Sequence, residues 1–151
     1  MSVVGLEELL AELAGSDRRV VTTNGCFDLL HAGHLDLLTR AKALGDVLVV
    51  LVNDDGSVRR LKGPSRPIVP AGERAELVAA LRPVDYVVLF SEDTPERALA
   101  AIRPAVHVKG GDYRREDLPE TAVVEEGGGE VVIVPLVPSR STTELLRRCG
   151  L

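Results

Sequence analysis

The stretch Arg19-Val-Val-Thr-Thr-Asn-Gly-Cys-Phe-Asp-Leu-Leu-His-Ala-Gly-His34 joins a predicted β-strand to a predicted helix. The strand covers the β-branched run from Arg19 to Thr23, and Gly25 lets the chain turn sharply after it. The continuous apolar run Val47 to Val52 is typical of a second strand covered on both faces. The helix between the two strands repeats apolar residues along one face, at Leu37, Leu38, Ala41 and Leu44. Together these elements form a βαβ unit with parallel strands.

The same alternation of β-branched runs and helical stretches continues through the chain. We expect three more strands, each after a helical stretch, at Val84 to Phe90, Ala105 to Lys109 and Val131 to Pro135. The prediction is an α/β protein with three layers (αβα) and a five-stranded parallel sheet. We expect a single domain over residues 1–151, with a leading helix within 1–16 and the α/β core in 19–151.

Local signals place the ends of several helices. The leading helix carries Leu6, Leu9, Leu10 and Leu13 at helical spacing and ends at Gly15-Ser16. Proline suits the first turn of a helix, so further helices are expected to begin at Pro70 and Pro95. The last helix opens with Ser141-Thr142-Thr143-Glu144, which has the Ser-x-x-Glu spacing of a capping box.

Composition excludes several classes of protein. The formal net charge of −5 argues against general nucleic-acid binding, which needs a basic surface. The longest apolar run, Val47 to Val52, is far shorter than the roughly 20 residues that cross a bilayer. The N-terminus lacks the basic start and apolar centre of a secretory signal, so we expect a cytoplasmic protein without a membrane partner. Two cysteines, Cys26 and Cys149, are too few for a disulfide framework.

The turn after the first strand is the richest candidate site, because ligands of open α/β sheets bind outside the carboxyl ends of the strands. His31 and His34 lie three residues apart at a predicted helix start, so both can face one ligand. Gly33 between them allows a close backbone approach, and the free N–H groups of the helix start favour phosphate.

Other interpretations of single residues are structural. His107 lies inside a predicted strand and is expected to be a packed side chain. Cys26 is interpreted as a small turn residue, since no motif supplies it with a base. A zinc site at His31 and His34 would need a third ligand, with Asp28 or Cys26 as the nearby candidates. We therefore favour phosphate over zinc and name no metal ligand.

Gly25 to His34 resembles the His-x-Gly-His signature of a nucleotidyltransferase superfamily that shares a Rossmann-like fold with class I aminoacyl-tRNA synthetases. The resemblance runs from about Leu6 to Gly150. Further motifs follow in the order seen in heptose 1-phosphate adenylyltransferases: Val52-Asn-Asp-Asp, Arg59-Arg-Leu-Lys-Gly-Pro-Ser-Arg-Pro67, Glu73-Arg74, Asp93-Thr-Pro-Glu96, Val108-Lys-Gly-Gly-Asp-Tyr113 and Ser141-Thr-Thr143. In many bacteria that activity is the C-terminal half of a protein whose other half is a ribokinase-like sugar kinase. The chain is similar to a free-standing adenylyltransferase, which implies a separate sugar kinase upstream.

The resemblance implies transfer of AMP from ATP to D-glycero-D-manno-heptose 1-phosphate, giving ADP-heptose and pyrophosphate. A phosphate monoester has its second pKa near about 6, so the nucleophile is already largely ionised at neutral pH. The protein then has to align two polyanions and neutralise charge. By this resemblance His31 and His34 donate to the nucleotide phosphates, and Lys62, from a mobile loop containing Gly and Pro, reaches the α-phosphate. Without it, Lys62 would be taken for an exposed surface lysine.

The resemblance also implies a wider binding site. Arg74 would bind phosphate, although alone it would be an ordinary solvated charge. Asp112 in Lys109-Gly-Gly-Asp-Tyr113 could accept from a ribose or sugar hydroxyl, although any turn after a strand looks similar. The expected nucleotide-binding set is Thr23, Asn24, Gly25, Phe27, Gly33, Arg74, Lys109, Gly110, Gly111, Asp112, Ser141, Thr142 and Thr143. Candidate substrate contacts are Asp28, Asn53 and Arg66, while Arg59 and Arg60 have no assigned role.

The expected cofactor is Mg²⁺, bound through ATP phosphates and waters because Mg²⁺ dehydrates reluctantly. Relatives of this fold are often dimers, which implies a homodimer. The related cytidylyltransferases carry Arg-Thr-x-Gly-Ile before the Ser-Thr-Thr motif, whereas this chain has Leu136-Val-Pro-Ser-Arg140. That difference disfavours cytidine and leaves the role of Arg140 open.

Three alternatives remain at this point. The chain could be a cytidylyltransferase for glycerol 3-phosphate or a related alcohol phosphate, an FMN adenylyltransferase, or a non-catalytic nucleotide-binding module. A non-catalytic module would not need His31, His34 and Lys62 together, which disfavours it. Residues 59–74 hold five basic side chains and one acid, a local charge of +4 in an acidic chain. We expect this segment to lie over the phosphate site.

Overall fold

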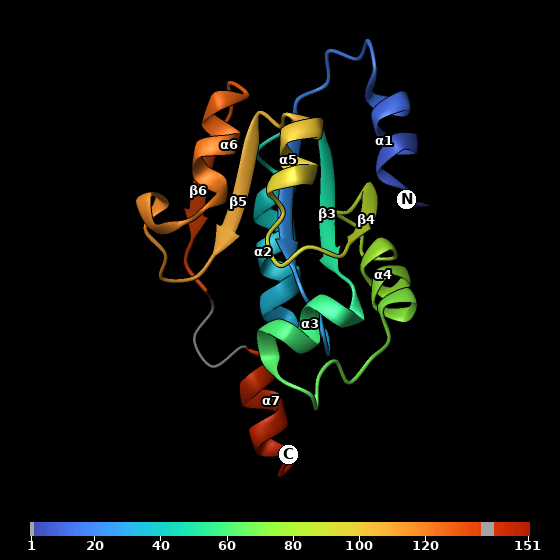
Figure 1. Cartoon of the computed structure of the whole chain (residues 1–151), viewed down its shortest axis with the longest axis vertical. Coiled ribbons are helices and arrows are strands. Elements are labelled where there is room, and N and C mark those ends of the chain that lie inside the picture. Colours follow the sequence, from blue (N-terminus) through green and yellow to red (C-terminus); the bar gives the residue numbers. More distant parts are fainter. Residues whose placement is uncertain (1, 137–140) are drawn as a thin grey trace.

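The computed structural model describes residues 2–136 and 141–151 and confirms the predicted α/β alternation (Figure 1). The elements, in chain order, are β1 (Ser2–Val3), α1 (Leu6–Leu13), β2 (Val20–Gly25), α2 (Ala32–Lys42), β3 (Val47–Asn53), α3 (Asp55–Lys62), α4 (Ala71–Ala79), β4 (Tyr86–Phe90), α5 (Glu96–Ile102), β5 (Val106–Gly110), a 3₁₀ helix η1 (Arg115–Asp117), α6 (Glu120–Glu126), β6 (Glu130–Val134) and α7 (Thr142–Arg148).

The sheet has six parallel strands in the order β1-β4-β3-β2-β5-β6, so the predicted number of five was wrong by one. All five predicted strands are present, with ends displaced by two residues or fewer. The additional strand, β1, pairs Ser2 with Tyr86 and Val3 with Val87 at the edge of the sheet. It precedes the leading helix within residues 1–16. A strand of two residues is too short to show an alternating pattern, which is why the sequence did not reveal it.

Helices cover both faces of the sheet, as Figure 1 shows. On one face α2 and α4 pack against alternate residues of β3, namely Leu48, Val50 and Val52. On the other face α1, α5 and α6 pack against Val47, Val49 and Leu51. All seven residues of β3 are buried, as the continuous apolar run predicted. Within the described part of the chain, none of the helices has the length and apolar character needed to span a bilayer.

Helix α3 corrects the expectation of a mobile loop around Lys62. The carboxylate of Asp54 accepts a hydrogen bond from the backbone N–H of Ser57 at 2.8 Å and caps the start of the helix. The helix ends at Gly63, whose φ of 103° favours glycine. Lys62 is therefore the last residue of a capped helix, and the loop begins after it.

The strand order places a switch point between β2 and β5. From β2 the chain builds β3 and β4 toward one edge, and then returns to add β5 and β6 on the other side. Thr22 lies opposite His107, and Thr23 opposite Val108, at this junction. In doubly wound sheets the crevice outside the carboxyl ends of two such strands is the usual ligand site.

One glycine lies where two segments touch. A Cβ atom on Gly129 would lie 2.2 Å from the backbone carbonyl oxygen of Pro104. This overlap could be relieved only by a shift of the main chain. We predict that Gly129→Ala lowers the free energy of unfolding by about 2 kcal/mol or more, measured by urea denaturation. Gly127→Ala is the matched control, because its nearest contact would be an ordinary 3.5 Å. Equal stability of the two variants would contradict this prediction.

His107 is a packed strand residue, as the sequence indicated. It is fully buried, and its Nδ1 lies 2.8 Å from the hydroxyl oxygen of Thr22. Its Nε2 is enclosed and has no hydrogen-bond partner among the described residues. Burial, with a smaller contribution from the charge of Lys109, lowers the pKa of His107 to about 3.

This burial predicts acid sensitivity. The unfolded chain binds a proton at His107 near pH 6.5, while the folded protein does not until about pH 3, so stability falls as the pH drops through this window. Between pH 6.5 and 5 the loss from this group is about 2 kcal/mol. We expect His107→Gln to flatten the pH dependence of urea unfolding by that amount. Parallel pH curves for the wild type and the variant would refute the assignment.

Candidate active site

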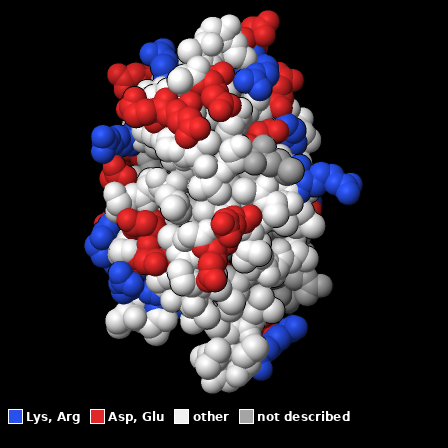
Figure 2. All heavy atoms as spheres, turned by 90° about the vertical axis from the view of Figure 1, so that its right-hand side faces the viewer, with Lys and Arg blue, Asp and Glu red and all other residues white. Residues whose placement is uncertain are grey.

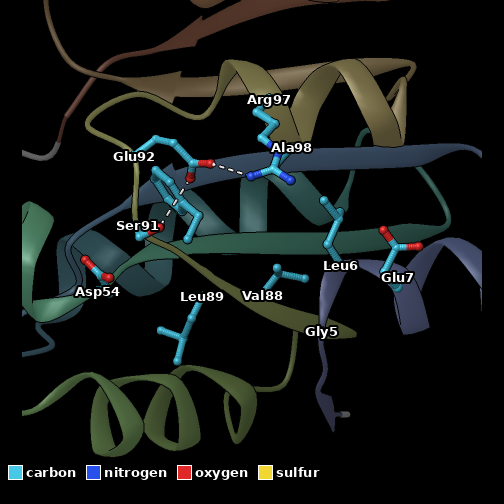
Figure 3. Close-up of a pocket in the computed structure, with 11 residues that line it drawn as sticks. Gly5, Leu6, Glu7, Asp54, Val88, Leu89, Ser91, Glu92, Arg97 and Ala98 are labelled. Atoms are coloured by element: carbon cyan, nitrogen blue, oxygen red, sulfur yellow. Dashed lines mark hydrogen bonds and ion pairs between the residues drawn. The ribbon is translucent and has the colours of Figure 1, made fainter.

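Two cavities are candidates for a ligand site. One of about 410 Å³ lies beside α1, β4 and α5 (Figure 3). Its Arg97 pairs with Glu92 at 3.4 Å, and none of its described lining residues is a histidine or lysine. The other, of about 510 Å³, lies at the carboxyl ends of β2, β3 and β5 and contains both histidines of the signature turn. We take the second cavity as the candidate active site.

Most of the predicted site residues meet in this cavity, although they come from five parts of the chain. Those that line it are Asn24, Gly25, Phe27, Asp28, His31, Gly33, His34, Asn53, Lys62, Arg66, Lys109, Ser141, Thr142 and Thr143. The predicted residues that do not line it are Thr23, Arg74, Gly110, Gly111 and Asp112.

The turn between β2 and α2 is held in an unusual backbone conformation. Phe27 and Leu29 have φ values of 50° and 55°, a region that non-glycine residues rarely adopt. A Cβ atom on Gly25 would lie 3.1 Å from the Phe27 ring, so the glycine makes room for this ring. The Phe27 ring in turn lies 5.2 Å from the His34 ring, between centroids. Such local strain is typical of functional turns.

Hydrogen bonds with the backbone fix the orientation of both histidines. The Nδ1 atom of His31 accepts from the N–H of Gly33 at 3.1 Å, and the Nδ1 of His34 accepts from the N–H of His31 at 3.2 Å. An accepting Nδ1 carries no proton, so the ring proton of each lies on Nε2. The ring centroids are 3.9 Å apart, which makes the two histidines a paired donor unit.

The electrostatics of His34 favour a neutral ring. Burial, followed by the nearby His31, lowers the pKa of His34 to about 4. At neutral pH His34 is therefore uncharged. It can donate one hydrogen bond from Nε2 to an anion, and it does not serve as a strong acid.

Arg74 has a structural position instead of the predicted phosphate contact. Its side chain is 1% exposed and lies beneath the cavity. The guanidinium donates to the carbonyl oxygens of Val69, Cys26 and Asn53, and it pairs with the carboxylate of Asp55 at 2.8 Å. The resemblance implied an arginine that binds phosphate, whereas the N–H groups of Arg74 bind other parts of the protein.

Asp28 lines the cavity and also has a structural role, while its contact with the substrate stays a prediction. Its buried carboxylate accepts from the N–H groups of Ile68 and Val69 and pairs with Arg66 at 2.8 Å. Burial alone would raise the pKa of Asp28, but these two N–H groups and Arg66 lower it below its ordinary value. The carboxylate therefore anchors the loop that follows α3 to the signature turn.

The predicted concentration of positive charge is largely neutralised. Of the five basic residues in 59–74, Arg66 and Arg74 are paired as described, and Arg60 pairs with Asp93 at 2.7 Å. Lys62 is exposed, lines the cavity and forms no ion pair with any described residue. Acidic side chains gather in clusters on the face that carries α1 and α4, as Figure 2 shows. The site therefore has fewer unpaired positive charges than the sequence indicated.

Of the predicted residues outside the cavity, Thr23, Gly110 and Gly111 support neighbouring elements. The Thr23 hydroxyl donates to the carbonyl oxygen of Val108 at 2.8 Å and joins β2 to β5. Asp112 is exposed and does not line the cavity. Gly110 and Gly111 make room for side chains: a Cβ on Gly110 would lie 3.1 Å from Leu136, and one on Gly111 would lie 3.0 Å from Tyr113.

The start of α7 closes the cavity on one side. The Thr142 hydroxyl donates to the backbone carbonyl of Asp28 at 2.6 Å. Ser141 caps the helix by accepting from the N–H of Glu144, but the Glu144 carboxylate pairs with Arg147 and Arg148. Only half of the predicted capping box is therefore present. Arg140 lies outside the described residues.

The remaining chemistry of the cavity is limited. Burial raises the pKa of the Cys26 thiol, despite opposing charges led by Lys62, so Cys26 is a poor nucleophile, as expected. Among the described residues no three His, Cys, Asp or Glu side chains form a group that could hold a metal ion. Sequence reasoning missed Glu120, which is 2% exposed and lines the cavity from the first turn of α6. Nothing local in the sequence distinguishes it from an ordinary helix-start glutamate.

We predict that Asp28→Asn loosens the site. The change removes the charge that holds Arg66 and weakens acceptance from two N–H groups, and we expect a loss of about 3 kcal/mol in unfolding free energy. Hydrogen–deuterium exchange should rise in residues 63–69. Asp36→Asn breaks an exposed pair with Arg40 and should change stability by about 0.5 kcal/mol or less. Unchanged exchange in 63–69 would rule out the anchoring role.

The comparisons with known proteins agree with this geometry. The cytidylyltransferase-like family matches residues 22–144. The chain is 52% identical over 142 residues to the bifunctional protein HldE of Streptomyces coelicolor, covering 94% of this chain, and 49% identical over 143 residues to that of Trichlorobacter lovleyi, covering 95%. It spans only 31% and 29% of the length of these two relatives.

Solved structures give the same result. A lipopolysaccharide core biosynthesis protein from Thermoplasma volcanium superposes with a TM-score of 0.66 at 30% identity, covering 80% of this chain and 97% of that one. The pantoate-beta-alanine ligase of Francisella tularensis shares the fold at 11% identity, with a TM-score of 0.62 over 95% of this chain and 69% of that one. The resemblance drawn from the His-x-Gly-His turn is confirmed: the chain belongs to the cytidylyltransferase-like family of nucleotidyltransferases.

Proposed function

We propose that the protein transfers AMP from ATP to D-glycero-D-manno-heptose 1-phosphate, forming ADP-heptose and pyrophosphate. The observation that carries this proposal is the pair of oriented imidazoles, His31 and His34, in one cavity with the exposed Lys62. The identity of about 50% to HldE proteins supports the choice of a heptose phosphate as acceptor.

The chemistry follows from the charges of the substrates. An oxygen of the sugar phosphate attacks the α-phosphorus of ATP, and the bond from that phosphorus to the bridging oxygen breaks, so pyrophosphate leaves. The nucleophile needs no general base, because its second pKa is near about 6. The Nε2–H groups of His31 and His34 donate to phosphate oxygens, and Lys62 neutralises charge that builds during the transfer.

A second candidate function differs in the nucleotide, CTP in place of ATP. The family name refers to cytidylyl transfer, whereas the motif order and the residues before Ser141 favour adenosine. A cytidylyltransferase acting on glycerol 3-phosphate or a related alcohol phosphate is therefore the second candidate, with an FMN adenylyltransferase as a further variant.

Several partners belong to the same proposal. Mg²⁺ would neutralise the triphosphate and would be held by phosphate oxygens and waters, since the described residues provide no group of three ligands. A kinase reaction can supply a sugar 1-phosphate, and we propose a sugar kinase as its source. We also propose a cytoplasmic homodimer, and an ADP-heptose product used for lipopolysaccharide or another heptose-containing glycan or metabolite.

The direct test is an acceptor screen. Pyrophosphate release is measured with ATP or CTP against both anomers of heptose 1-phosphate, glycerol 3-phosphate and FMN. We expect turnover with ATP and heptose 1-phosphate. Turnover only with CTP would support the second candidate, and nucleotide binding without pyrophosphate release would indicate a non-catalytic module.

Variants separate catalysis from binding. Lys62→Met should lower kcat by about 100-fold or more, since a cation at the transferred phosphoryl group acts mainly in the transition state. His34→Ala should abolish turnover while ATP binding falls only modestly. Arg82→Met is the control, because it removes an exposed positive charge outside the cavity. If Lys62→Met and Arg82→Met had the same kcat, the assigned role of Lys62 would be wrong.

A further inference from the structure

The candidate active site contains a buried carboxylate that the proposed reaction does not use. Glu120, the first residue of α6, is 2% exposed and lines the cavity. Within residues 2–136 and 141–151, its side chain takes part in no hydrogen bond and no ion pair. Lys109 lines the same cavity and forms no salt bridge with it. The protein itself therefore leaves this carboxylate without compensation.

An uncompensated buried carboxylate destabilises the ligand-free protein. In the described chain, two side-chain polar atoms are fully enclosed and have no hydrogen-bond partner: Asn24 Oδ1 and His107 Nε2. The carboxylate oxygens of Glu120 are not among them. The small accessible area of Glu120 thus includes its carboxylate oxygens, and the residue lines the cavity. The carboxylate is therefore placed to accept hydrogen bonds from whatever fills that space.

Asn24 is a second, independent acceptor in the same cavity. It lies near the end of β2, at the switch point next to β5, and its Oδ1 is enclosed without a partner. Buried amide oxygens nearly always have a donor. Because Asn24 Oδ1 is fully enclosed, the unsatisfied acceptor that a ligand in this cavity can reach is Glu120, which indicates a ligand that brings donors.

The chemistry of Glu120 limits the ligand. A carboxylate repels phosphate, for which His31, His34 and Lys62 of the same cavity are the candidate donors. A metal ion is disfavoured because no group of three ligands forms among the described residues. The adenine edge presents a donor beside an acceptor, which matches an acceptor-only group poorly. Adjacent sugar hydroxyls present two donors and match the two oxygens of a carboxylate.

We propose that Glu120 accepts hydrogen bonds from the hydroxyl groups of a sugar bound in the cavity, which makes it a specificity-determining residue. This inference rests on the proposed function, whose two substrates each carry a sugar: the ribose of ATP and the heptose of the acceptor. Both sources present the same chemistry, so the experiment has one arm for each.

The test uses Glu120→Gln, which keeps the size of the side chain and removes its charge. ATP and 2′,3′-dideoxy-ATP binding are measured by calorimetry, and KM is measured for heptose 1-phosphate. Hydrogen bonds to a charged acceptor are strong, so we expect affinity for one sugar to fall about ten-fold or more. Glu126→Gln is the control, since it removes a charge from the exposed end of the same helix.

The two arms identify the sugar. If the ribose is bound, Glu120→Gln weakens ATP, the wild type binds 2′,3′-dideoxy-ATP more weakly than ATP, and the variant no longer distinguishes the two nucleotides. If the heptose is bound, nucleotide affinity stays constant and KM for heptose 1-phosphate rises. In both cases the melting temperature of the ligand-free variant should stay equal or increase, because an unpaired buried charge has been removed.

Three results would overturn the inference. Unchanged affinity and KM would show that no hydroxyl meets Glu120. Equal weakening of ATP and 2′,3′-dideoxy-ATP, with KM for heptose 1-phosphate unchanged, would assign the residue to the base or phosphates. A lowered melting temperature with unchanged binding would show a purely structural role. In each of these cases wild-type turnover keeps the proposed function intact, whereas a wild type that binds neither substrate overturns both.

Discussion

The buried guanidinium of Arg74 holds together the segments from which the site is built. It donates to the carbonyl oxygen of Cys26, directly after β2, and to that of Asn53, the last residue of β3. It also donates to the carboxylate of Asp55 at the start of α3. No neighbouring strand of the described chain donates to these carbonyl groups at the strand ends. Without the arginine they would be buried and would have no hydrogen-bond donor. One residue of α4 thereby fixes the spacing between the signature turn and the helix that ends in Lys62.

Asp28 complements this arrangement from the signature turn. Its carboxylate binds the loop before α4, and its backbone carbonyl accepts from Thr142 at the start of α7. The turn is thus held on two sides while its backbone keeps the left-handed conformation at Phe27 and Leu29. Rigid support of this kind allows the two imidazoles to keep one tautomer and one orientation without a ligand.

The contrast between Lys62 and its neighbours bears on how an acidic protein would bind the polyanions of the proposed reaction. Arg60, Arg66 and Arg74 are used in internal ion pairs, so they shape the site and contribute little free positive charge. Lys62 stands at an exposed helix end with its ammonium group unpaired by any described residue. A flexible cation beside rigid neutral donors can adjust as charge moves from the nucleophile to the leaving group.

The sequence by itself determined the alternating α/β architecture and the location of the site. The apolar run of β3, the helical spacing after His34 and the Gly-rich turn are local patterns, and local patterns survive without knowledge of the rest of the chain. The same holds for the two histidines, because residues three apart at a helix start share a face in any context.

Only the tertiary structure decided which polar groups remain available to a ligand. Arg74 carries the same charge as Lys62, and Asp28 the same charge as Glu120, but Arg74 and Asp28 have partners within the protein. The partners of Arg74 lie 19 to 48 residues away in the chain, apart from the Val69 carbonyl five residues before it. Those of the Asp28 carboxylate lie 38 to 41 residues away. Whether a charge is satisfied internally or faces a cavity depends on such long-range contacts, which no local pattern encodes. The edge strand β1 is decided in the same way, because two residues become a strand only when β4 offers an edge to pair with.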